Sequence, residues 1–359
     1  MLDELLAKFN SNKKTIFFIV DIAIAFIYLF IMAYSFSRPL RDIVSFLTGN
    51  SIIVITIYFL VFHVLYFIVS LPLKYFRDLT YIKTNNFIDW IKIVFKKEIS
   101  VFFALFFVIQ VIYFFLETDV LWWWLPVAFL CIVFRFAMEL APKYLSHLFF
   151  KSTALDPSEF KLRLIELVGR ANIKINDVFS IAYAQSEAVI FSGRLMLSDK
   201  IMDYAPEEIE VIVARETAMH YYGHIKFRLI IEALIMLLSF FIVNIAFKPI
   251  AAYFGFEFIF DIETLPVLLG LFFVSFLLMS FIQNYFFRLM DKQADIYALK
   301  MAGSPDAFIS LLFRKQQEAE KQTIDFFINQ ILTGRISDVK RIVLAQDYAQ
   351  EMSLKNRGV

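Results

Sequence analysis

The sequence predicts a mainly α-helical, polytopic membrane protein with about six transmembrane helices and one more polar α+β domain. Of its 359 residues, 60% are hydrophobic, 45 are phenylalanine and only 19% are charged. Soluble domains carry roughly 25% charged residues, so this is the composition of a membrane protein. The net charge of +1 gives no electrostatic basis for nucleic-acid binding, and the single cysteine excludes an intrachain disulfide.

The predicted spans are the apolar segments that are long enough to cross a bilayer, which takes about 20 residues in a helix. Six segments qualify: Ile16–Phe36, Ile52–Leu73, Ile99–Leu116, Leu121–Ala141, Phe227–Phe247 and Leu265–Phe287. They divide the chain into four parts: four spans in residues 1–141 with a basic segment at 74–98, a polar domain at 142–226, a helical hairpin at 227–287, and a second polar part at 288–359.

The distribution of lysine and arginine predicts the orientation of these spans. The N-terminal segment and the segment after the second span are rich in lysine and arginine, and the alternate loops carry few of them. We therefore expect the N-terminus, the polar domain and the C-terminus on the cytoplasmic side.

The polar domain has recognisable elements of secondary structure. Ser158–Arg170 has helical periodicity, and Leu195–Leu197 is typical of a strand. Pro206 begins a further helix, in which an apolar stripe leads into Arg215-Glu216-Thr217-Ala218-Met219.

At this helix the sequence resembles the integral-membrane CAAX prenyl protease family of zinc metalloproteases, which carries H-E-x-x-H in the same frame. The resemblance runs in one order along the chain, through Leu71–Lys96, Ala154–Val178, Leu195–Asp199, Arg288–Ala298 and Ser337–Ile342. It implies a cytoplasmic zinc-metalloprotease-like domain, with a chamber enclosed by the membrane helices. Two histidines at i and i+4 would hold zinc with a third ligand, and the intervening glutamate would act as general base.

Five positions depart from the family's pattern. Arg215 and Met219 stand where the motif has its histidines, and Asp291 replaces the glutamate that is the third ligand. Glu187 replaces an asparagine that the family carries in an edge segment near its cleft. Arg335 replaces the histidine of the family's C-terminal His-Pro pair. Three further positions are those of the family: Glu216, Asp295 and Arg341.

These departures predict a site without metal. Arginine stays protonated and repels a divalent cation, and a thioether is too soft a ligand for zinc. Without zinc, the carboxylates of Glu216 and Asp291 need another cation. We therefore expect the guanidinium of Arg215 to bridge Glu216 and Asp291, with no cofactor bound.

An alternative keeps a metal. Glu216, His220 and His224 lie four residues apart on one helical stripe, which with Asp291 or Asp295 would form a shifted zinc site. That stripe lies about 100° from the ancestral ligand face of the helix.

The function that we predict is that of a pseudoprotease, a non-catalytic membrane protein of the metalloprotease fold. Its chamber or cleft would bind a peptide, a lipidated segment or a partner membrane protein, and its helices would contact the lipid bilayer. The alternatives are an active membrane zinc endopeptidase that uses the shifted site, and a transport or lipid-handling protein.

Overall fold

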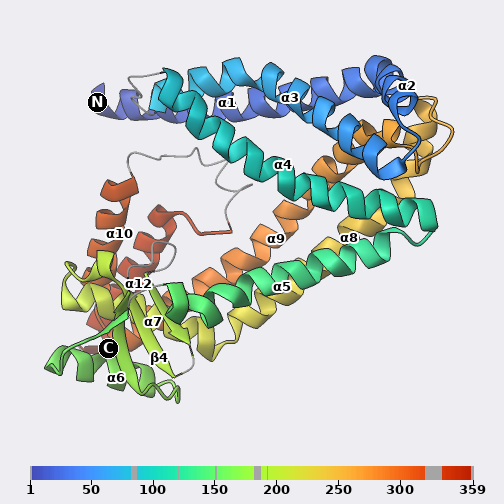
Figure 1. Cartoon of the computed structure of the whole chain (residues 1–359). Coiled ribbons are helices and arrows are strands. Elements are labelled where there is room, and N and C mark those ends of the chain that lie inside the picture. Colours follow the sequence, from blue (N-terminus) through green and yellow to red (C-terminus); the bar gives the residue numbers. More distant parts are fainter. Residues whose placement is uncertain are drawn as a thin grey trace. The chain divides into compact units, whose positions relative to one another are not determined.

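The computed structural model describes residues 2–81, 87–119, 121–149, 152–181, 187–191, 193–319 and 334–356. The chain forms two compact units. One comprises Met1–Ile132 and Leu234–Met279, and the other comprises Val133–Ala233 and Ser280–Val359. Figure 1 shows the elements of both units.

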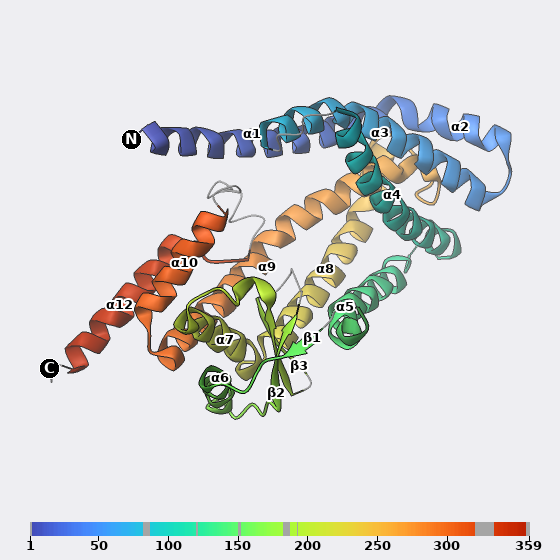
Figure 2. The same cartoon turned by 60° about the vertical axis from the view of Figure 1, so that its left-hand side comes forward.

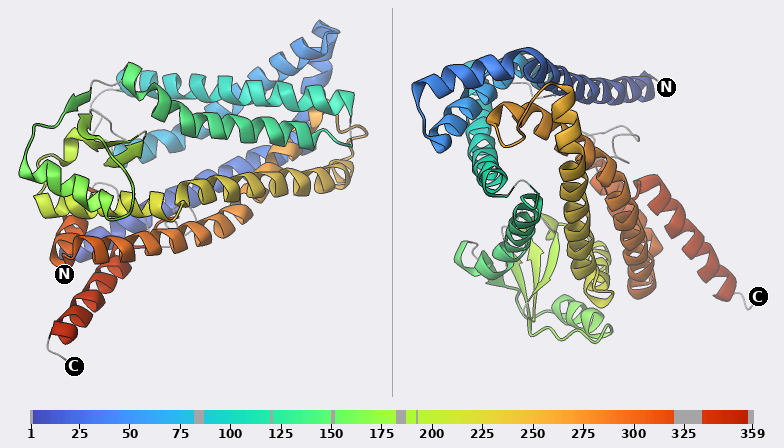
Figure 3. Two further views of the ribbon diagram at one scale, coloured as in Figure 1. Left: turned by 90° about the horizontal axis from the view of Figure 1, so that it is seen from below. Right: turned by 90° about the vertical axis from the view of Figure 1, so that its right-hand side faces the viewer.

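The first unit consists of long helices: α1 (Leu2–Ile31), a π-helical turn (Met32–Phe36), α2 (Ser37–Leu47), α3 (Ser51–Tyr81), α4 (Phe87–Thr118), the start of α5 (Trp124–Phe149), most of α8 (His224–Tyr253), a 3₁₀ turn (Ile262–Thr264) and the first part of α9 (Leu265–Ala302). The side chain of Asn50 caps α3, accepting a hydrogen bond of 3.2 Å from the backbone N–H of Ile53. Figure 3 shows α8 and α9 as long helices, and the rings of Phe240 and Phe272 pack 4.8 Å apart between them.

Five helices of the described residues are long and apolar enough to cross a membrane: Ile16–Leu47, Ser51–Asp78, Phe87–Thr118, His224–Tyr253 and Ile262–Ala302. Only 11–33% of their most apolar windows is buried within the protein, so most of this apolar surface is available to lipid. These helices confirm five of the six predicted spans. The fourth, Leu121–Ala141, falls on α5, part of which lies outside the described side chains.

The second unit is built around a four-stranded sheet. Its strands are β1 (Ser152–Ala154), β2 (Asp177–Ile181), β3 (Ala188–Phe191) and β4 (Arg194–Ser198), in the order β1-β2-β4-β3. β2 and β4 are parallel, and the other two pairs are antiparallel. β4 confirms the strand predicted at Leu195–Leu197.

Helices pack on this sheet and complete a hydrophobic core: α6 (Glu159–Gly169), α7 (Pro206–Tyr221), α10 (Pro305–Ala319) and α12 (Asp338–Asn356), with the end of α9. Figure 2 shows α6 and α7 beside the sheet. Ser158 caps α6 by accepting a hydrogen bond from the N–H of Lys161 at 3.2 Å, as the predicted helix start requires. The fully buried side chains of Leu164, Leu197, Val213 and Phe308 meet in this core.

Candidate functional site

The helix α7 carries the segment that corresponds to the zinc motif. Pro206 occupies its first turn, where the missing N–H costs no hydrogen bond, and the backbone N–H of Ala205 donates to Oε2 of Glu208 at 3.2 Å. The buried face of α7 includes Val213 and Ala214, which pack into the core of the second unit. That packing leaves Arg215, Glu216 and Met219 on the less buried side of the helix, whereas Thr217 and Ala218 are buried.

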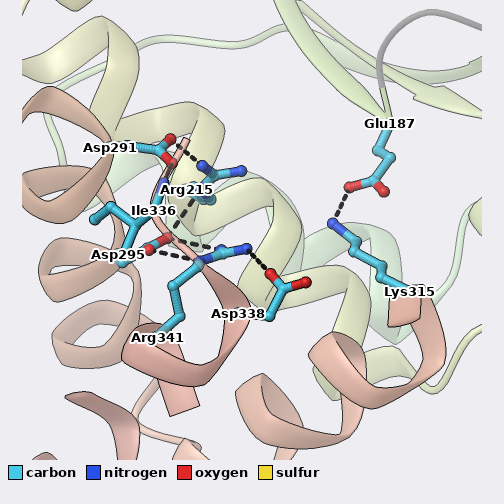
Figure 4. A network of polar contacts seen from close by, with 8 residues as sticks. All are labelled: Glu187, Arg215, Asp291, Asp295, Lys315, Ile336, Asp338 and Arg341. Carbon is cyan, nitrogen blue, oxygen red and sulfur yellow. Dashed lines mark hydrogen bonds and ion pairs between the residues drawn. The ribbon is translucent and has the colours of Figure 1, made fainter. Parts of the chain in front are cut away.

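Arg215 binds two carboxylates of α9. Its Nη2 donates to Oδ1 of Asp291, and its Nε lies 3.0 Å from Oδ1 of Asp295 (Figure 4). The side chain of Arg215 is 26% exposed, whereas those of Asp291 and Asp295 are 4% and 0% exposed. Because the two aspartates are four residues apart on one helix, a cation that reaches one can also reach the other.

Asp295 also binds a second arginine. Nε and Nη2 of Arg341, on α12, donate to its two oxygens at 2.7 and 2.9 Å, which is a bidentate pair. Nη1 of Arg341 lies 3.5 Å from Oδ1 of Asp338. Burial lowers the pKa of Arg341. The carboxylates of Asp295, Asp291 and Asp338 together raise it by more, so the pKa is raised overall.

The remaining oxygen of Asp291 faces the chain before α12. The backbone N–H of Ile336 lies 3.4 Å from Oδ2 of Asp291. Ile336 follows Arg335, whose side chain is exposed and lines a cavity between α9 and α12. Asp291 is therefore engaged by a guanidinium on one oxygen and approached by a peptide N–H on the other.

Glu216 has a different partner from the one that we predicted. Its Oε1 lies 3.4 Å from Nε2 of His220, and the second carboxylate of Arg215 is Asp295. Neighbouring residues of an α-helix point about 100° apart, so the side chains of Arg215 and Glu216 diverge. The predicted contact between Arg215 and Asp291 is present, but the predicted bridge to Glu216 is wrong.

The shifted metal site required one continuous helix through His224, and the structure has a break there. α7 ends at Tyr221, and Gly223 adopts a left-handed conformation with φ +66° before α8 begins at His224. Nε2 of His224 lies 3.1 Å from Oε1 of Gln293. Gly223 is a sequence signal for the end of a helix, although the spacing of Glu216, His220 and His224 suggested one continuous helix.

Glu187 forms an ion pair just before β3. Its Oε2 lies 2.5 Å from Nζ of Lys315 on α10, 128 residues later in the sequence (Figure 4). Burial lowers the pKa of Lys315, more than Glu187 raises it, and the neighbouring Arg215 and Arg341 lower it further. No local sequence signal pointed to Lys315, whereas Asp338 has an i, i+3 spacing to Arg341 that could have been recognised.

The donor set does not fit zinc. Arg215 occupies the position of the first histidine, and its guanidinium is bound to Asp291, which occupies the position of the third ligand. Half-buried Met219 occupies the position of the second histidine, one turn after Arg215. A cation already pairs with the ligand carboxylate, and a thioether is a poor zinc ligand. Among the described residues, no group of three or more His, Cys, Asp and Glu side chains is arranged to hold a metal ion.

Comparisons with known proteins agree with the fold. Residues 161–323 match the model of Peptidase family M48, a range that includes α7 and Asp291 and ends before Arg335. The structure is similar to the crystal structure of Ste24p from S. mikatae, with a TM-score of 0.58 and 19% sequence identity over 80% of this chain and 74% of that chain. No curated protein matches the sequence. The chain is a mainly α-helical membrane protein with a Ste24p-like fold, and residues 161–323 carry its similarity to Peptidase family M48.

Proposed function

We propose that this protein is a non-catalytic member of its protease family, which binds a peptide, a lipidated segment or a partner protein without cleaving it. The ion pair between Arg215 and Asp291 carries this proposal. A zinc protease needs three protein ligands and an open position at the metal. Here the residue at the first ligand position, Arg215, is itself a cation, and it binds the carboxylate of Asp291 at the third ligand position.

The sheet offers a place for such a ligand. β3 stands at the end of the strand order in the described part of the sheet, and it pairs with β4 on one side. An edge strand can accept an extended peptide as a further strand through its backbone. Val189 and Ile190 lie in the middle of β3, and this binding mode needs no metal.

The carboxylate that flanks this strand is paired. Glu187 precedes β3 and its backbone C=O accepts a hydrogen bond from Ser198 at 2.9 Å, while its side chain binds Lys315. These two contacts tie the start of the strand to β4 and to α10. A preorganised edge loses less conformational entropy when a peptide binds, which favours binding.

Metal content and cleavage test the catalytic half of the proposal. The purified full-length chain, reconstituted in lipid nanodiscs, would be analysed for zinc and incubated with a prenylated peptide that ends in a CAAX sequence. We expect zinc well below one ion per chain and an intact peptide. Stoichiometric zinc together with cleavage that a chelator abolishes would overturn the proposal in favour of an active endopeptidase.

Site-specific crosslinking tests the binding half. A photoreactive amino acid at Val189, in β3, is expected to crosslink to the same prenylated peptide. Leu162, an exposed residue of α6, provides the matched control position. Equal crosslinking from both positions, or none from Val189, would contradict binding along the edge strand.

A further inference from the structure

A cavity of about 440 Å³ lies between the second half of α9 and the start of α12, within the second unit. One stripe of α9 lines it at the helical spacing i, i+3, i+4, i+7: Tyr285, Arg288, Leu289 and Lys292. A stripe of α12 with the same spacing faces it: Lys340, Val343, Leu344 and Asp347. Two helix faces thus form the walls, and a volume of this size is typical of small-molecule sites.

The lining is strongly basic. Five cationic side chains and one acidic side chain, Asp347, surround the cavity: Arg288, Lys292, Arg335, Lys340 and Arg341. Arg341 is bound to Asp295 and Asp338, so its charge is already balanced. Lys292, Arg335 and Lys340 are exposed and leave an excess of positive charge at the opening. Such a surplus attracts an anion.

An apolar surface leads into the same cavity. Leu265–Phe287 of α9 contains no charged residue, and Arg288 is the first one after it. Ile282, Tyr285 and Leu289 lie along one side of the helix and are 46%, 57% and 46% exposed. Exposed apolar side chains at the end of a membrane-spanning segment contact acyl chains, and the basic side chains that follow lie at headgroup level.

We propose that this cavity binds the phosphate of an anionic phospholipid headgroup. Lys292, Arg335 and Lys340 neutralise the phosphate, and the acyl chains lie along the face of Ile282 and Tyr285. Basic pockets beside membrane helices are suited to such headgroups. A free phosphate shares the headgroup chemistry but has nothing to place on the apolar face. The inference does not depend on whether the chain cleaves or binds a peptide.

The test is a thermal-shift titration of the full-length chain in detergent micelles with three probes: dioctanoyl phosphatidic acid, dioctanoyl phosphatidylcholine and inorganic phosphate. We expect saturable stabilisation by phosphatidic acid, a much weaker effect of inorganic phosphate, and none with phosphatidylcholine at equal concentration. Raising the salt concentration should weaken the effect of phosphatidic acid, because screening reduces attraction at an exposed site.

Paired variants identify the site. Lys292→Gln/Lys340→Gln removes two cations of the cavity and should weaken the apparent affinity for phosphatidic acid about 30-fold, since each exposed cation near lipid contributes about 1 kcal/mol. Lys300→Gln/Lys355→Gln removes two exposed lysines from the same two helices outside the cavity and should leave the affinity unchanged. Lys292→Arg/Lys340→Arg should retain binding.

Two results would overturn the proposal. If both Gln pairs weaken binding equally, phosphatidic acid binds through the general charge of the protein. If inorganic phosphate binds as tightly as phosphatidic acid, the cavity recognises free phosphate and the lipid assignment is wrong.

Discussion

Arg215 and Arg341 bind the same carboxylate, that of Asp295, from two different helices (Figure 4). Arg215 places its Nε 3.0 Å from Oδ1, and Arg341 donates to Oδ1 and Oδ2 at 2.9 and 2.7 Å. Asp291, one turn earlier on α9, takes the Nη2 of Arg215. Two cations and two buried carboxylates thus balance each other, which is the condition for burying such charges at moderate cost.

Removing the charge of Arg215 should destabilise the protein. Arg215→Met leaves the buried Asp291 without its cation, and breaking a buried pair in this way costs about 3–5 kcal/mol. We expect a lower midpoint of thermal unfolding in detergent. The double variant Arg215→Met/Asp291→Asn should recover much of the loss, because no unpaired charge remains. If the second substitution only adds a further loss, the two residues are not an energetic pair.

Restoring the ligands should restore zinc binding. The variant Arg215→His/Met219→His/Asp291→Glu places two histidines at i and i+4 of α7 with a carboxylate on α9. We expect it to retain close to one zinc ion per chain after dialysis, measured by elemental analysis. Arg215→Gln/Met219→Gln/Asp291→Glu is the matched control and should retain none. Equal zinc in the two variants would show that the metal binds elsewhere.

The turn between α7 and α8 should depend on glycine. Gly223 has φ +66°, and an added Cβ would meet no atom within 4 Å, so the cost of Gly223→Ala comes from the backbone alone. We expect a loss of about 1–2 kcal/mol in unfolding free energy. Gly169, the last residue of α6, has equal space, and Gly169→Ala should be neutral or stabilise the protein by up to about 1 kcal/mol. Equal effects would mean that the left-handed turn is not required.

The stability contributed by Lys315 should depend on pH. Its pKa is lowered in the folded protein, so between that value and the unfolded value of about 10.4 the unfolded state binds more protons. Stability from this group therefore rises with pH across that window and is constant below it. The unfolding midpoint of the unsubstituted chain minus that of Lys315→Met should increase as pH rises towards about 10.4.

Glu187 provides the control for this pH effect. Glu187→Gln removes a carboxylate that raises the pKa of Lys315, so the rise should begin at a lower pH in this variant. A difference between the unsubstituted chain and Lys315→Met that stays flat over the whole range would contradict the lowered pKa.

The sequence predicted the position of the replaced site and the contact between Arg215 and Asp291, but not the other contacts of the site. Arg215, Met219 and Asp291 could be located because the motif frame is a local property of the chain. The ion pair of Glu187 with Lys315 joins residues 128 positions apart, and only packing of α10 near the sheet brings them together. The second partner of Arg215 was missed because the direction of a helical side chain decides it.

By itself, the sequence determined the membrane character of the protein, the spans that the structure confirms, the strand at β4 and the loss of both motif histidines. Apolar runs, turn residues and side-chain chemistry act locally, so they can be read without a fold. The tertiary structure decided that the second carboxylate bound by Arg215 is Asp295, that Gly223 separates His224 from α7, and that two stripes of α9 and α12 enclose a basic cavity. Each of these depends on how helices distant in sequence pack or where a helix ends, and periodicity within one helix does not encode that.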